Sequence, residues 1–174
     1  MFALHRLALV ILLFAVTASA AQQAESYRLA PGDKVAITVF GENDLSMDVT
    51  LADDGELNYP FLGKIRVAGL TVPQLERAIA DGLRGDYLIN PEVTVAIQQY
   101  RPFFLNGEVN RPGSYEYQPG LTLEKALALA GGLSPRAARG KIEVKRADSD
   151  TFERVDMNDP VYAGDVINVP QSFF

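Results

Sequence analysis

Side chains that could contact a sugar or a second protein subunit gather between residues 100 and 117. Three tyrosines lie there with two arginines and two glutamates between them. A tyrosine ring has an apolar face and a polar tip, which suits both sugar stacking and a subunit interface. Packing within the protein's own core is the competing interpretation, because most aromatic residues are packing elements. The predicted carbohydrate or subunit contact residues are Tyr100, Arg101, Glu108, Arg111, Tyr115 and Tyr117.

Groups that commonly carry catalysis are scarce. The one histidine, His5, lies in a segment that we expect to be removed, and the sequence has no cysteine. A histidine base, a histidine metal ligand and a thiolate nucleophile are therefore not expected in the mature protein. Carboxylates near turns and strand ends are usually structural or solvated, so we predict no catalytic residue, no metal site and no cofactor. The carboxylate pairs considered are Asp53 with Asp54, Asp86 with Glu92, and Glu108 with Glu116.

Residues 1–20 have the pattern of a secretory signal peptide. Basic His5 and Arg6 precede an apolar run, and small residues lead to a cleavage site after Ala20. An uncleaved membrane anchor is the alternative, but the apolar run is short for a bilayer span. We therefore expect export to the periplasm. Because there is no cysteine, we expect neither disulfides nor a lipoprotein.

The charge of the chain argues against a nucleic acid partner. The 174 residues have a formal net charge of −6, and loss of Arg6 with the signal peptide leaves −7. Nucleic acid binding depends on clustered lysine and arginine side chains, which an acidic chain supplies poorly. The length and the hydrophobic content of 48 % fit one or two small folded domains.

Short runs of alternating apolar and polar residues predict half-buried strands in the first half of the chain. Asp53-Asp54-Gly55 is a strong signal for a tight turn between two of these runs. Because the runs follow each other closely, they predict a meandering sheet. The expected strands are residues 35–39, 47–51, 56–59, 64–67 and 92–100.

One helix is expected in each half of the chain. Gly69-Leu70-Thr71 and Gly120-Leu121-Thr122 each precede an apolar stripe of helical period, and glycines follow both stripes. Thr71 and Gln74 have the spacing of a capping box. We therefore predict an α+β fold of two small sheet-plus-helix modules. The expected buried residues are Leu75, Ala78, Ile79 and Leu83 in the first helix, and Leu123, Ala126, Leu127 and Ala130 in the second.

A Gly-Asp turn also occurs in both halves. Pro31-Gly32-Asp33 and Ala163-Gly164-Asp165 each precede an alternating apolar strand. Between the two modules, Pro112 and Gly113 mark a further turn that follows the segment Gly107-Glu108-Val109.

Several ordered motifs resemble those of the polysaccharide biosynthesis/export family. In the first half they are YRLAPGD (27–33), Asp54-Gly55, PFLGKI (60–65), Gly69-Leu70-Thr71 and NPEVTV (90–95). In the second half, Gly107-Glu108-Val109 with PGSY (112–115), LTL (121–123), ALAGGL (128–133) and GDVINVP (164–170) look like the family's soluble ligand-binding β-grasp (SLBB) module. The resemblance implies a polysaccharide export N-terminal domain at 27–100 and a β-grasp-like SLBB domain at 101–174.

The resemblance implies a non-enzymatic periplasmic component of exopolysaccharide or capsule export. Family members form rings, often of eight subunits, that pass a growing polymer outward alongside an inner-membrane copolymerase. Larger translocons also have a lipidated N-terminal cysteine, a second β-grasp module and a C-terminal pore helix, none of which we find here. We therefore expect a homo-oligomeric ring that works with a separate outer-membrane protein, in the periplasm or associated with the outer membrane.

Two other functions compete with export. A soluble carbohydrate-binding or regulatory module would sense the polymer without conducting it. A polysaccharide-trimming hydrolase would need one of the carboxylate pairs named above.

Overall fold

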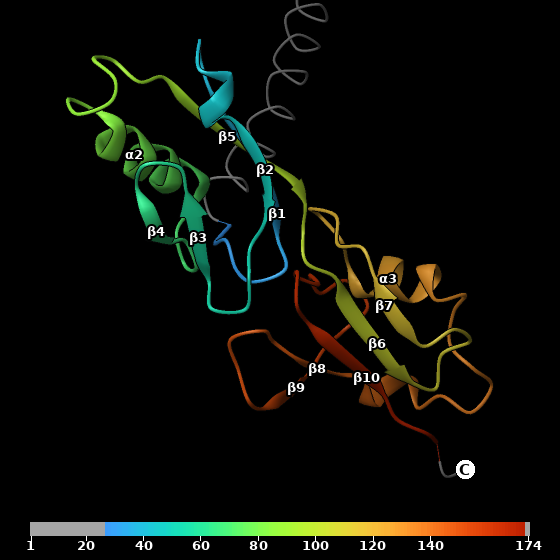
Figure 1. The fold of residues 1–174 in the computed structure, drawn as a ribbon. Helices are drawn as coiled ribbons and strands as arrows, with labels where there is room; N and C mark the ends of the chain where they lie inside the picture. The colour runs from blue at the N-terminus through green and yellow to red at the C-terminus, as the bar shows by residue number, and fades with distance from the viewer. Residues whose placement is uncertain (1–26, 173–174) are drawn as a thin grey trace, which may run out of the picture. The chain divides into compact units, whose positions relative to one another are not determined.

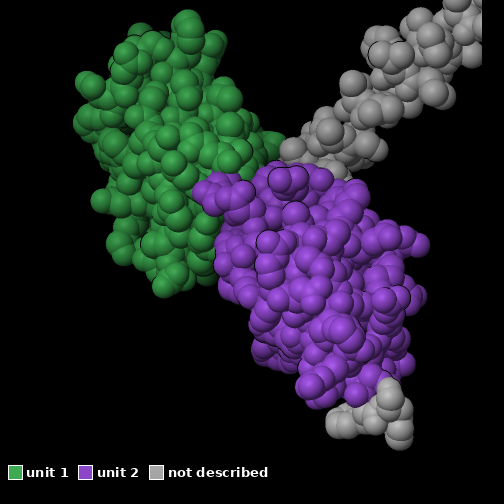
Figure 2. Space-filling model, turned by 90° about the vertical axis from the view of Figure 1, so that its right-hand side faces the viewer, with its two compact units in different colours: residues 1–98 green, residues 99–174 purple. Residues whose placement is uncertain are grey.

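The computed structural model describes residues 27–172, which form two compact units that meet in sequence between Gln98 and Gln99 (Figure 1). Each unit has a hydrophobic core of its own, and Figure 2 colours the two units separately. The predicted signal peptide, residues 1–20, lies outside the described residues. Within residues 27–172, no helix is both long and apolar enough to span a membrane.

The first unit contains a three-stranded sheet and a separate β-hairpin. The prediction of one meandering sheet is therefore wrong. After Leu51, whose N–H donates to Asp33 O, the chain turns at Gly55 and the next two strands pair only with each other. The three-stranded sheet has the order β2 (Met47–Thr50), β1 (Lys34–Val39), β5 (Val93–Gln99), with a short 3-10 helix η1 (Asn43–Leu45); the hairpin consists of β3 (Glu56–Tyr59) and β4 (Gly63–Arg66).

Helix α2 (Val72–Leu83) begins at the capping box that the sequence predicts. The Thr71 N–H donates to the Gln74 side chain over 2.9 Å, and Gly85 follows the helix with a φ of 91°. Of the predicted stripe, only Ala78 is exposed rather than buried. The buried residues recur every four positions, so Ala78 lies at the solvent edge of the stripe. They are Leu75, Ile79 and Leu83.

The second unit is a mixed five-stranded sheet with one helix, which confirms the predicted α+β class. One pair of neighbouring strands is parallel and the other three pairs are antiparallel. All four predicted residues of the second helical stripe are buried. The strand order is β7 (Gly113–Tyr115), β6 (Phe103–Gly107), β10 (Val166–Val169), β8 (Glu143–Lys145), β9 (Phe152–Arg154); the helices are α3 (Leu123–Leu129) and the 3-10 helix η2 (Arg139–Lys141).

The two Gly-Asp turns have the same geometry. Gly32 and Gly164 have φ values of 89° and 87°, which a residue with a side chain rarely adopts. In both turns the aspartate carboxylate accepts the N–H of the residue three positions earlier over 2.8 Å. Both carboxylates are buried, with 0 % of Asp33 and 1 % of Asp165 exposed. They differ in their side-chain partners, because Asp33 accepts the Tyr27 hydroxyl whereas Asp165 pairs with Arg146.

Candidate carbohydrate or subunit contact site

The structure divides the six predicted contact residues into two groups within the second unit. The first group is Tyr100, Arg101 and Tyr117. The rings of Tyr100 and Tyr117 meet edge to face, with centroids 5.4 Å apart and planes at 84°. Such a pair stabilises beyond the area that it buries.

Arg101 lies beside the Gly-Asp turn of Asp165. A Cβ added at Gly164 would lie 2.7 Å from Arg101 Nε. The charge of Arg101 also acts on the Asp165 carboxylate. The first group therefore adjoins the turn that ends before β10.

The second group, Glu108, Arg111 and Tyr115, is bonded to its own chain near the end of α3. Arg111 donates from its backbone N–H to Ala130 O and from Nη2 to Leu129 O, both over 3.0 Å. These bonds satisfy carbonyls that a helix C-terminus leaves unpaired. The Tyr115 hydroxyl donates to Arg111 O, and the Glu108 carboxylate accepts the Ser134 hydroxyl. The contact role of these three residues remains a prediction.

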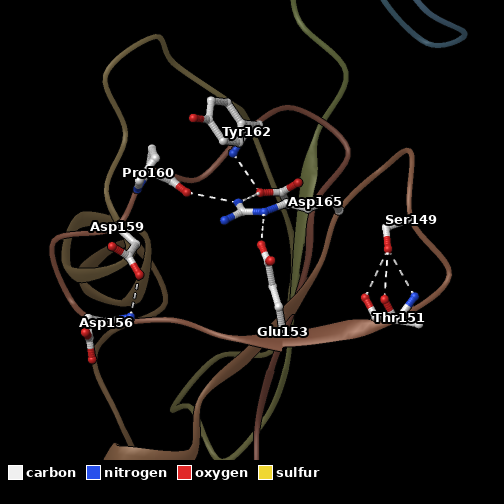
Figure 3. A network of polar contacts seen from close by, with 9 residues as sticks. Ser149, Thr151, Glu153, Asp156, Asp159, Pro160, Tyr162 and Asp165 are labelled. Atoms are coloured by element: carbon white, nitrogen blue, oxygen red, sulfur yellow. Dashed lines mark hydrogen bonds and ion pairs between the residues drawn. The ribbon is translucent and has the colours of Figure 1, made fainter.

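An ion pair between a half-buried arginine and a buried aspartate lies beside the first group, and the sequence alone did not predict it (Figure 3). Arg146 Nη1 is 2.7 Å from Asp165 Oδ2, which also accepts the Tyr162 N–H over 2.8 Å. Arg146 Nε donates to Glu153 over 2.7 Å, and Nη1 also donates to Pro160 O over 3.0 Å. The guanidinium thus joins β8, β9 and the segment before β10.

The ring of Tyr162 lies over the same guanidinium and is open to solvent. Arg146 Cζ is 5.2 Å from the ring centroid, which is the geometry of a cation–π contact. Half of Tyr162 remains exposed. Arg146, Tyr162 and Asp165 come from segments at least 29 residues after Tyr117, so spacing alone could not group them. The sequence signal that was available is the Gly-Asp turn at Gly164.

Burial and neighbouring charges set the ionisation of this cluster. Burial raises the pKa of Asp165, and the Tyr162 N–H and the charges of Arg146 and Arg101 oppose that rise. Burial also raises the pKa of Tyr117, and the nearby Tyr100, Tyr162 and Asp165 add to the effect. Burial alone would lower the pKa of Arg146, but Glu153 and Asp165 raise it. Arg146 is therefore cationic at any physiological pH.

The raised pKa of Asp165 predicts that its contribution to stability grows as the pH falls. The folded protein holds this proton at pH values where the unfolded chain, with its ordinary pKa of 3.8, has lost it. Stability therefore increases as the pH drops through the raised value toward 3.8. We expect the unfolding free energy of wild type, relative to Asp165→Asn, to be larger at about pH 4 than at neutral pH. Denaturant titrations of both proteins test this, and a difference that shrinks on acidification contradicts it.

The cluster has side-chain types that suit a hydroxyl-rich or anionic group. It combines tyrosine rings with arginine donors, while the Asp165 carboxylate is already occupied by Arg146 and the Tyr162 N–H. Aromatic faces and planar donors are the usual elements of an interface or ligand site. Among residues 27–172, no cluster of three or more histidine, cysteine or acidic side chains could hold a metal ion.

Each of the two units matches a known protein family model. Residues 21–98 match the family model described as polysaccharide biosynthesis/export protein, and residues 102–159 match the SLBB domain. The chain therefore belongs to the polysaccharide biosynthesis/export family, as its motifs predict.

Three named relatives share part of their length with this chain. It is 36 % identical over 148 residues to exopolysaccharide production protein ExoF of Rhizobium meliloti, covering 78 % of this chain and 35 % of ExoF. It is 28 % identical over 125 residues to polysialic acid transport protein KpsD of Escherichia coli, covering 70 % and 22 %. It is 31 % identical over 107 residues to EPS I polysaccharide export outer membrane protein EpsA of Ralstonia nicotianae, covering 59 % and 28 %. The chain thus spans about a third or less of each relative.

Proposed function

We propose that this protein is a periplasmic component of exopolysaccharide or capsule export that carries no enzymatic activity. The observation that carries the proposal is the pair of family matches, one to each compact unit. The relatives are named for exopolysaccharide production, polysialic acid transport and polysaccharide export. Export to the periplasm rests on the signal-peptide pattern of residues 1–20.

The mechanism that we propose is passive conduction through a ring of identical subunits. Each unit is near the lower size limit for a stable core, so association between copies would bury additional surface. Weak contacts repeated around a wet channel would let a polymer pass without being trapped. In this proposal an inner-membrane copolymerase supplies the polymer and a separate outer-membrane protein completes the path.

We propose that the polymer contacts the first group of predicted residues and the exposed side chain of Tyr162 beside it. Tyr162 is half exposed and lies over the Arg146 guanidinium, so it offers an aromatic face next to fixed donors. This arrangement also supports the second candidate function, a carbohydrate-binding module that senses polymer. The contact residues in this proposal are Tyr100, Arg101, Tyr117 and Tyr162.

Deletion of the gene separates export from sensing. Export predicts loss of secreted polymer with accumulation of precursor inside the cell. Expression of the full chain should restore secretion and remove the accumulated precursor. Sensing predicts an altered amount of secreted polymer without that accumulation. Release of new reducing ends from the polymer by the purified protein would instead support a hydrolase.

The proposed ring of subunits predicts that the purified exported protein has a larger mass than a monomer. Light scattering over a wide range of protein concentration should give a mass that is a multiple of the subunit mass. The expected cause is association of two-unit subunits through surfaces that a monomer leaves open. A monomer at every attainable concentration would contradict the ring while leaving the family membership untouched.

A further inference from the structure

The turn between β3 and β4 holds an aromatic residue in an unfavourable backbone conformation. Phe61 has a φ of 63° and is the one non-glycine residue with positive φ among residues 27–172. This conformation is strained for a residue with a side chain, and bulky residues rarely adopt it. Glycine or asparagine at this position would remove the strain. Strain of this kind is often retained where a side chain has a function.

The residue after Phe61 anchors the turn. A Cβ added at Gly82 would lie 2.8 Å from Leu62 Cδ1, so the missing side chain on α2 leaves room for Leu62. Leu62 packs against the core of the first unit. Because Leu62 is held inward, the strained turn directs its neighbour outward, and 66 % of Phe61 is exposed.

A second exposed ring lies against Phe61. The centroid of the Tyr87 ring is 5.0 Å from that of Phe61, and the planes are tilted by 33°. The Tyr87 hydroxyl donates to Phe61 O over 3.4 Å, and 47 % of Tyr87 is exposed. The two rings come from turns on either side of α2 and together form one apolar surface with a polar tip, which we call the Phe61–Tyr87 platform.

The size of the platform favours a small ligand over a protein. A whole aromatic side chain has about 150–250 Å² of surface, so the two exposed parts together offer roughly 200 Å². A stable protein interface buries about 800 Å² on each partner. The C–H face of a sugar ring, in contrast, is about as large as an aromatic ring and packs on it by dispersion.

We propose that the Phe61–Tyr87 platform stacks against a sugar ring of the exported polymer. The choice of a polysaccharide as ligand rests on the proposed function. The platform lies in the first unit, whereas the candidate site described above lies in the second. The chain therefore contacts its polymer through both modules.

Binding of defined oligosaccharides to the exported full chain tests the platform. The probe is the set of oligosaccharides released by partial hydrolysis of the polymer that the host strain secretes, measured by titration calorimetry. Phe61→Gly should weaken binding at least tenfold, because it removes one ring while glycine adopts the same φ without strain. Tyr87→Phe keeps the second ring and should bind within about threefold of wild type.

Phe40→Ala is the matched control, because 80 % of Phe40 is exposed and its ring contacts no other ring among residues 27–172. It should bind like wild type. Equal affinities of Phe61→Gly and wild type, or no binding by wild type, would overturn the proposal. A change of oligomeric mass in Phe61→Gly with unchanged sugar affinity would also overturn it, in favour of a protein contact.

The outcomes for the platform and for the proposed function can be told apart. Loss of export on gene deletion, together with unchanged sugar affinity of Phe61→Gly, removes the platform and keeps the function. Weakened binding by Phe61→Gly, together with normal export in the deletion strain, keeps the platform and removes the function.

Discussion

Gly107→Ala should lower the free energy of unfolding by about 3–5 kcal/mol. Gly107 ends β6, has a φ of 83° and pairs with Val169 of β10. An added Cβ would lie 2.1 Å from Val169 O, which is backbone and cannot rotate away. The variant must therefore separate β6 from β10 in addition to straining its own backbone. Denaturant unfolding followed by circular dichroism measures the loss.

Gly120→Ala in the same unit separates the clash from the backbone strain. Gly120 has nearly the same φ, 81°, but nothing lies within 4 Å of an added Cβ. Its cost should be about 1–2 kcal/mol, the cost of a left-handed conformation alone. Equal losses in the two variants would mean that β6 and β10 do not approach each other as closely as the structure shows.

Local signals predicted the helices well. The capping box at Thr71 and Gln74 and the apolar stripe of α3 depend on residues within a few positions of each other. The chain itself enforces such contacts, so a sequence pattern is sufficient to identify them. Ala78 is the exception, because a small residue at the edge of a stripe carries little information about burial.

Strand pairing was the part of the fold that the sequence could not supply. Alternation identifies β3 and β4 as strands but does not say which strands they pair with. The turn at Gly55 was predicted correctly, with a φ of 70°. The chain after that turn forms a hairpin, and the N–H groups of Val67 and Ala68, twelve and thirteen positions later, donate to Gly55 O.

The sequence also indicated the candidate site only in part: it indicated contacts between residues close in sequence, but not those between distant residues. Tyr100 and Tyr117 were expected in one cluster, and their rings contact each other because the two residues flank the β6–β7 hairpin. Arg111 remains a predicted carbohydrate or subunit contact residue, and its side chain also donates to Leu129 O at the end of α3. Arg146 and Asp165 were missed because the sheet brings β8 next to β10 across about twenty intervening residues. An ion pair between residues that lie nineteen positions apart in the sequence has no short-range sequence signature.

Arg146→Ala should be as destabilising as the Gly107 variant, by about 3–5 kcal/mol, because it leaves a buried charge without its partner. Only 1 % of Asp165 is exposed, and Arg146 is its ion-pair partner at 2.7 Å. The variant also removes the donor to Glu153 and Pro160 O. Thermal or denaturant unfolding of the purified chain measures the loss.

Two controls show whether the loss comes from the buried carboxylate. Lys64→Ala breaks an ion pair of similar length, 2.9 Å, but Lys64 is 72 % exposed and its loss should change stability little. The double variant Arg146→Met, Asp165→Asn removes both charges and should recover most of the stability, because Asn can still accept the Tyr162 N–H. The penalty of Arg146→Ala should also shrink at about pH 4, since protonation of Asp165 removes the charge that needs the guanidinium. A penalty that is independent of pH would mean that Arg146 stabilises the unit by packing its side chain and not by neutralising Asp165.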